Sequence, residues 1–84
     1  MNIVEFVAAL NHKFDGGFEL DTPGIRYTRV LGTSGNSRDA YCFIDAQGNI
    51  YKAASWKAPA KGIRSTLATV DMARVDRYGS WLYR

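Results

Sequence analysis

Two aromatic-rich segments, residues 40–45 and 49–56, flank the short stretch DAQGN and constrain the fold more than any other feature. Both segments favour strands, because β-branched and aromatic side chains pack well on a pleated surface. A type I turn followed by Gly48 in the left-handed conformation would join them as a hairpin with a three-residue loop. The expected register pairs Asp45 with Asn49, Ile44 with Ile50, Phe43 with Tyr51, Cys42 with Lys52 and Tyr41 with Ala53.

This register divides the hairpin into two faces that are both partly apolar. One face holds Tyr41, Phe43 and Tyr51, and the other holds Cys42, Ile44, Ile50 and Lys52. A sheet with helices on one side needs only one buried face. The aromatic face is therefore either the core or an exposed stacking platform. Burial is the reading we favour, since buried aromatic rings are how a small domain gains stability.

An amphipathic helix is expected over residues 2–14, NIVEFVAALNHKF. Its apolar residues recur at spacings of three and four, and they are Ile3, Phe6, Val7, Leu10 and Phe14. Asn2 would cap the helix, and Gly16 or Gly17 would supply the left-handed residue after its last turn.

The segment between this helix and the hairpin predicts one more strand. Residues 25–34, IRYTRVLGTS, alternate in polarity and are rich in strand-forming types. Residues 18–24 are expected to form a connector with a turn at Pro23 and Gly24, and the small polar residues 32–39 a mobile loop.

The last third of the chain predicts a second helix. Residues 65–78 follow a capping Ser65 with Leu67, Val70 and Arg74 at helical spacing, although TLATVDM also alternates well enough for a strand. Residues 79–84, GSWLYR, should fold back on the core. The predicted fold is a single α+β domain, residues 1–84, with an N-terminal helix, a three-stranded antiparallel sheet and a C-terminal helix, in the order αβββα.

Length and composition indicate one small folded unit. A chain of 84 residues has room for a single core, and 46% hydrophobic with 13% aromatic residues exceeds what disordered segments carry. The single Cys42 cannot form an internal disulfide, and the first thirty residues lack the pattern of a signal peptide. No stretch reaches the roughly 20 apolar residues of a membrane-spanning helix. We therefore expect a soluble protein of a reducing cytoplasm.

No constellation of residues predicts an enzyme, a metal site or a cofactor. His12 is the only histidine and Cys42 the only cysteine, too few for a structural zinc site or a supported catalytic pair. Asp71 and Asp76 are five residues apart and share no helical face well. We expect a surface histidine, a small buried cysteine and no catalytic residues.

Charge is distributed unevenly along the chain. Residues 1–24 carry one lysine against four acidic residues, whereas residues 25–66 carry seven cations against two acids. The densest part is SWKAPAKGIRSTL, residues 55–67, where Lys57, Lys61 and Arg64 follow Trp56 with no acid among them. Such asymmetry indicates an anionic partner, and placed at the start of the predicted last helix these cations would lie beside free backbone N–H groups.

Three resemblances bear on function. RDAYCFID, residues 38–45, is similar to the aromatic strand of RNA-recognition motif domains, where Tyr41 and Phe43 would stack bases. The order αβββα with a basic entrance to the last helix resembles double-stranded RNA-binding domains. Residues 41–64 resemble a block of small, uncharacterised proteins of tailed bacteriophages. That block has an aromatic strand, a turn with glycine, a strand ending in Lys, and then Trp-Lys-x-Pro-Ala-Lys and Arg. The last likeness implies a phage origin and the cytoplasm of a bacterial host.

Two functions are compatible with these patterns. The leading hypothesis is a small phage accessory protein that binds DNA or RNA, and its expected contact residues are Lys57, Lys61, Arg64, Arg38, Lys52 and Trp56. The alternative is a protein-interaction module that docks on a host or phage protein, in which Trp56 and Tyr51 would matter more than the lysines. A structural piece of the virion is a third possibility.

Overall fold

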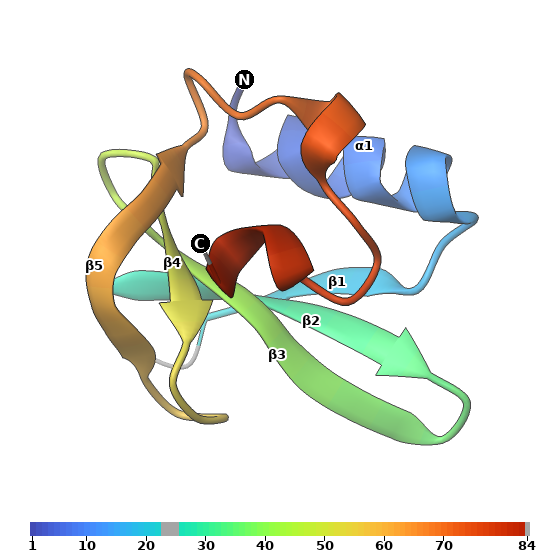
Figure 1. Ribbon diagram of the computed structural model, residues 1–84. Helices are drawn as coiled ribbons and strands as arrows, with labels where there is room; N and C mark the ends of the chain where they lie inside the picture. The colour runs from blue at the N-terminus through green and yellow to red at the C-terminus, as the bar shows by residue number, and fades with distance from the viewer. Residues whose placement is uncertain (23–25, 84) are drawn as a thin grey trace.

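The computed structural model describes residues 1–22 and 26–83, which form one antiparallel sheet covered on one face (Figure 1). The sheet is a meander with the strand order β1-β2-β3-β4-β5. Its elements, in chain order, are α1 (Ile3–Phe14), β1 (Phe18–Asp21), β2 (Tyr27–Ser34), β3 (Ser37–Asp45), β4 (Asn49–Ala53), β5 (Pro59–Thr66) and two short 3₁₀ helices, η1 (Met72–Arg74) and η2 (Ser80–Tyr83).

The predicted αβββα order with a three-stranded sheet is wrong. The residues expected to form a connector contain β1, and residues 59–66, expected to lead into a helix, form the edge strand β5. The expected loop at residues 32–39 mostly continues β2 and β3, while the expected turn at Pro23 and Gly24 lies outside the described residues. Both edge strands, β1 and β5, were therefore missed in the prediction, because their sequences are polar.

No α-helix forms over residues 65–78. A turn replaces it, because the N–H of Val70 donates to the carbonyl of Thr66 at 2.9 Å and the N–H of Leu67 donates to the carbonyl of Gly48 at 2.7 Å. The side chain of Asp71 then caps η1. The β-branched Thr and Val residues of this segment lower its helix propensity. A short helix also needs an amphipathic face packed on the core to be stable, and here the turn hydrogen bonds form instead.

Helix α1 confirms its prediction and shows why its start is well defined. The Asn2 side chain accepts from the N–H of Glu5, and the Glu5 carboxylate accepts from the N–H of Asn2, both at 2.8 Å, which is a complete capping box. The left-handed residue at the helix end is Asp15, with φ of 61°, ahead of the two glycines expected in that role.

The hairpin register is confirmed at three predicted pairs, Cys42 with Lys52, Phe43 with Tyr51 and Ile44 with Ile50. Gly48 has φ of 82°, the left-handed conformation that the turn requires. The Asp45 carboxylate tightens the turn by accepting from the backbone N–H of Asn49 at 2.9 Å.

A β-bulge between β2 and β3 breaks the predicted aromatic face. Val30 pairs with Cys42 but Leu31 pairs with Ala40, so Tyr41 is the extra residue. Tyr41 therefore joins Cys42 in the core, and the prediction that it shares a face with Phe43 and Tyr51 is wrong. Phe43 is also buried, but it lies outside the core cluster.

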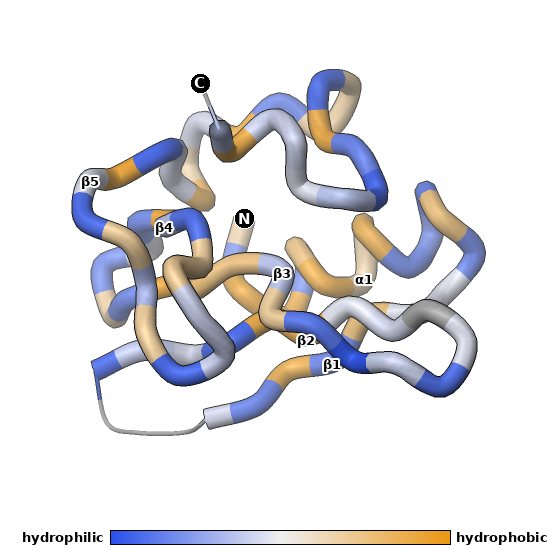
Figure 2. The backbone as a smooth tube through the Cα atoms, turned by 60° about the horizontal axis from the view of Figure 1, so that its bottom comes forward, coloured by the Kyte–Doolittle hydropathy of each residue, from blue (hydrophilic) through white to orange (hydrophobic). Residues whose placement is uncertain are grey.

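The core lies between the sheet, α1 and the C-terminal segment, residues 67–83. Its buried members come from all three layers, and they are Phe6, Val7, Leu10, Phe18, Val30, Tyr41, Cys42, Ile44, Ile50, Val75 and Leu82. Hydrophobic colour follows α1 and the middle of the sheet in Figure 2, whereas the tip of the β2–β3 hairpin is hydrophilic and exposed. One face of the sheet is thus covered, and the other carries no helix among the described residues.

Polar contacts fasten the C-terminal segment to this core. The Tyr41 hydroxyl donates to the carbonyl of Asp76 at 2.6 Å and accepts from Trp81 Nε1 at 2.9 Å. Arg77 donates to the carbonyl of Phe14 at 3.0 Å, and Lys13 donates to that of Val75 at 2.8 Å. The prediction that the chain end folds back on the core is confirmed.

Candidate functional site

The two edges of the sheet differ in charge. Strand β1 carries Glu19 and Asp21, whereas residues 46–70, which include β4 and β5, contain four cations and no acid. Strands β1 and β5 lie at opposite edges of the sheet. We call residues 54–66, the β4–β5 loop with β5, the basic edge.

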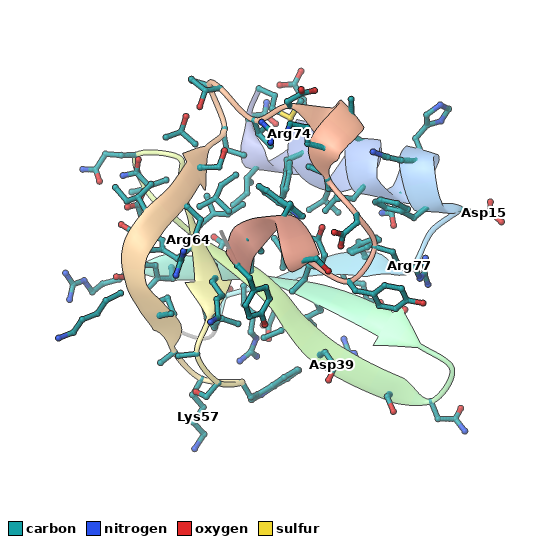
Figure 3. The ribbon with its side chains drawn as sticks, in the orientation of Figure 1. Asp15, Asp39, Lys57, Arg64, Arg74 and Arg77 are labelled. Carbon is teal, nitrogen blue, oxygen red and sulfur yellow. The ribbon has the colours of Figure 1, made fainter. Side chains whose placement is uncertain are left out.

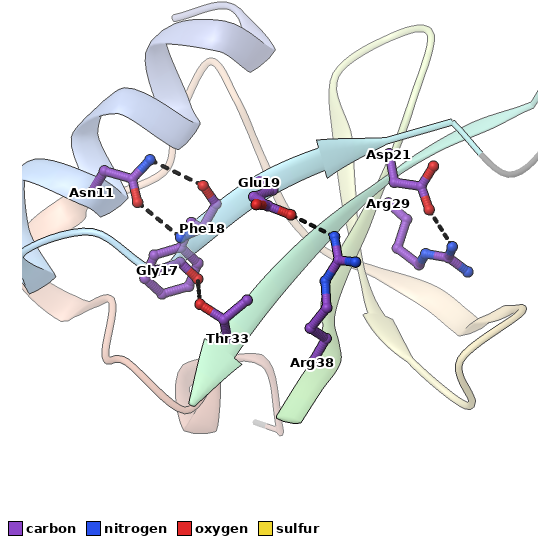
Figure 4. A network of polar contacts seen from close by, with 8 residues as sticks. All are labelled: Asn11, Gly17, Phe18, Glu19, Asp21, Arg29, Thr33 and Arg38. Carbon is purple, nitrogen blue, oxygen red and sulfur yellow. Dashed lines mark hydrogen bonds and ion pairs between the residues drawn. The ribbon is translucent and has the colours of Figure 1, made fainter. Parts of the chain in front are cut away.

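Arg38 does not belong to the basic edge. Its guanidinium pairs with Glu19 at 2.5 Å, and both side chains are more than half exposed. Figure 4 shows this pair beside β1, together with the ion pair of Asp21 with Arg29. The acidic strand thus engages two of the arginines that the sequence places in the basic middle of the chain.

Lys52 points to the covered face of the sheet. It lies opposite Cys42, and its ammonium group is 4.2 Å from the centroid of the Tyr83 ring. Lys52 also lines a cavity of about 150 Å³ with Asp39, Arg77 and other residues of the covered face. The structure therefore separates Lys52 from the contacts of Trp56. Those contacts lie on the opposite face of the sheet, which no described helix covers and which we call the open face.

The remaining predicted cations are exposed along the basic edge, but they do not point the same way. Lys57 lies in the loop and extends away from its tip, whereas Arg64 extends from β5 toward η2 (Figure 3). Lys61 lies between them on β5. The predicted helix entrance is wrong, because Lys57 lies on a loop and Lys61 and Arg64 lie on a strand, and no helix follows them directly in the described chain.

Trp56 is held in place by Arg29, a residue that the sequence analysis did not assign to the site. The guanidinium carbon of Arg29 lies 4.1 Å from the Trp56 ring centroid, and Arg29 Nη1 donates to the Trp56 carbonyl at 2.6 Å. The other terminal nitrogen of Arg29 pairs with Asp21. Arg29 is only 6% exposed, while Trp56 remains 44% exposed. A buried, fixed cation thus holds a half-exposed indole.

An aromatic cluster continues the open face beside this stack. The Tyr27 ring meets Phe43 and Tyr51 edge-on, with centroids 6.3 Å and 5.6 Å apart. Phe43 in turn lies opposite Arg29 in the sheet register. The Tyr51 hydroxyl donates to Asp45 at 2.8 Å, and this hydrogen bond raises the pKa of Tyr51.

The same contact helps to keep Asp45 ionised. Partial burial works against its charge, but hydrogen bonds from Asn49, Tyr51 and Gln47 outweigh burial and lower the pKa of the Asp45 carboxyl. The charge of Asp45 therefore stabilises the turn between β3 and β4.

The structure also places the residues that were weighed in the sequence for metal binding and catalysis. No group of three His, Cys, Asp or Glu side chains is placed there to hold a metal ion. His12 is exposed on α1, and Cys42 is fully buried, which raises the pKa of its thiol. Across residues 1–22 and 26–83, no helix has the length and apolar character needed to span a membrane.

Comparison with known proteins identifies the family of the chain. No curated protein and no solved structure matches it. A family of unknown function (DUF7717) matches residues 4–84. Since this match covers nearly the whole chain, the protein belongs to that family.

Proposed function

We propose that this protein binds nucleic acid through the basic edge, where Lys57 and Lys61 contact phosphates beside Trp56. The observation that carries the proposal is the charge of this edge. Both lysines are exposed, neither forms an ion pair with any described residue, and the nearest acids in sequence are Asp45 and Asp71. Phosphate groups are the anions that such a surface suits.

The scale of the proposed interaction follows from the number of cations. Lys57, Lys61 and Arg64 would neutralise about two to three phosphates, and each contact releases condensed counterions. The logarithm of affinity should then fall with the logarithm of salt concentration with a slope of about −1.4 to −2.7. Such a slope belongs to weak, sequence-independent binding. The resemblance of residues 41–64 to phage proteins supports a role as a phage accessory protein in the host cytoplasm.

The test is charge reversal at the basic edge. Anisotropy of a short labelled oligonucleotide should show that Lys57→Glu with Lys61→Glu abolishes most binding at low salt. The matched control is Arg38→Glu with Arg74→Glu, which alters net charge equally at two exposed residues outside the basic edge. Equal loss in both variants, or binding that ignores salt, would refute a local phosphate site.

A protein-interaction module is the second candidate, and Ile63 is the observation that favours it. Ile63 is 54% exposed on the edge strand β5, next to Tyr51 in the register. An open strand edge with an apolar residue and a nearby tryptophan suits a protein partner. A pull-down from host lysate with and without nuclease distinguishes the two functions. A partner that survives nuclease and is lost in Ile63→Lys supports this second function.

A further inference from the structure

We propose that the nucleic acid bound at the basic edge is single-stranded, and that Trp56 is the platform on which one of its unpaired bases stacks. This inference rests on the proposed function. It adds the class of nucleic acid and the residue that contacts a base.

Arg29 and Asp21 together hold Trp56 in a fixed orientation. Arg29 covers one side of the indole at 4.1 Å and also binds the backbone carbonyl of the same residue at 2.6 Å. The carboxylate of Asp21 pairs with the other terminal nitrogen, Nη2, and so fixes the guanidinium. The ring is therefore oriented before any ligand arrives, although it belongs to a loop.

Part of the Trp56 side chain remains accessible to a ligand. Trp56 keeps 44% of its surface in solvent, whereas Arg29 beneath it has 6%. Arg29 already uses both terminal nitrogens, so it is a positioning residue and not a phosphate ligand. A ligand that reaches this place would meet the exposed part of Trp56, since the guanidinium of Arg29 is buried and already bound.

An exposed indole suits a single strand better than a duplex. In a duplex the faces of the bases are covered by their neighbours, and only base edges and phosphates are available to a protein. In a single strand the faces are free to stack on an aromatic side chain while cations follow the backbone. Lys57 directly follows Trp56 in the loop, and Lys61 lies on the strand that begins two residues later. The basic edge thus combines one stacking surface with cations for the adjoining phosphates.

The alternative is that Trp56 only anchors the β4–β5 loop. In that case the contact of the ring with Arg29 is its whole role, and the exposed part of the ring binds no ligand. The two roles differ in a measurable way, because a stacked base quenches indole emission and an anchoring role does not.

The experiment is a fluorescence titration of the full chain with a single-stranded oligonucleotide and with the duplex of the same sequence. Trp81 is the other tryptophan, so Trp81→Phe isolates the emission of Trp56. If that variant fails to fold, the difference between wild type and Trp56→Phe reports the same signal. We expect strong quenching by the single strand and little by the duplex.

Affinity measurements complete the test. Trp56→Ala should weaken single-strand binding by about 5- to 150-fold, the range found when one stacking residue is removed, and Trp56→Phe by less. Trp56→Ala should leave the salt slope nearly unchanged, because no phosphate contact is lost. Equal affinity for single strand and duplex, with Trp56→Ala without effect, overturns this inference but not the proposed function. Absence of binding to either oligonucleotide overturns both.

Discussion

Two ion pairs on the same short strand, β1, form a matched experiment on the anchor of Trp56. Asp21 pairs with the buried Arg29, and Glu19 pairs with the exposed Arg38 (Figure 4). Alanine at either position removes one carboxylate from the same edge strand. Only the first substitution leaves a buried guanidinium without its counter-ion.

The expected magnitudes differ because the burial differs. Breaking a fully buried pair costs about 3–5 kcal/mol, but the Asp21 side chain is 39% exposed, so water offsets part of the loss and we expect about 1–2 kcal/mol for Asp21→Ala. Glu19→Ala should cost about 0–1 kcal/mol, since both partners are more than half exposed. In a domain of this size 1 kcal/mol lowers the melting temperature by about 4–8 °C.

Urea denaturation followed by circular dichroism measures both free energies of unfolding. Repeating it at high salt separates them further, because screening should remove the cost of Glu19→Ala and leave most of the cost of Asp21→Ala. Asp21→Ala should also change the emission of Trp56, since the guanidinium under the indole loses one of its two fixed partners. Equal costs for the two variants, or emission of Trp56 unchanged by Asp21→Ala, would refute the view that the Asp21–Arg29 pair holds the indole.

Three further predictions test the rest of the structure. Tyr41→Phe removes the hydroxyl that joins β3 to the C-terminal segment and should cost about 1–3 kcal/mol in thermal unfolding, whereas exposed Tyr78→Phe should cost less than about 0.5 kcal/mol. Asp45 has a lowered pKa in the fold, so its contribution to stability is present above its unfolded pKa of about 3.9 and is lost as pH falls through the lower folded pKa. Asp45→Asn should flatten that acid limb of the pH–stability curve. Cys42 should react with a thiol reagent only on unfolding, because it is fully buried and its thiol pKa is raised.

The parts of the fold that could be predicted are those with local signals. The expected cap at Asn2 and the apolar stripe that follows it predicted α1, and the turn at Gly48 predicted the β3–β4 register. Both signals act within a few residues and agree with the fold that the rest of the chain forms.

The missed strands share a different property, which is that they lie at the sheet edges. Strand β5 contains Pro59 and Gly62, residues that central strands avoid and edge strands tolerate, and β1 alternates with Glu19 and Asp21 in only four residues. Such sequences look like loops until a neighbouring strand pairs with them. The bulge at Tyr41 likewise leaves no local mark, although it moves a large side chain from one face to the other.

The candidate site was predictable in its exposed half only. Trp56, Lys57 and Lys61 stand out as an acid-free basic run beside an aromatic residue. Arg29 gave no such signal, because a cation in an alternating strand ordinarily faces solvent, and its carbonyl partner is 27 residues away in the chain. Its burial depends on where the β4–β5 loop closes over the sheet, which only the tertiary structure specifies.

The meander topology explains why the uneven charge along the sequence predicts uneven charge on the folded protein. In a sheet whose strand order equals the chain order, residues near the start and residues near the end of the strand series reach opposite edges. The acidic residues of β1 and the acid-free residues 46–70 therefore become two separate sides of one small protein. A polyanion bound as proposed would be attracted at β5, whereas at β1 the carboxylates of Glu19 and Asp21 are already paired with arginines, so the arrangement favours an orientation as well as an affinity. Moving the lysines of the basic edge to β1 and the acids of β1 to the basic edge would keep both the net charge and the number of cations constant. This exchange should weaken the proposed binding.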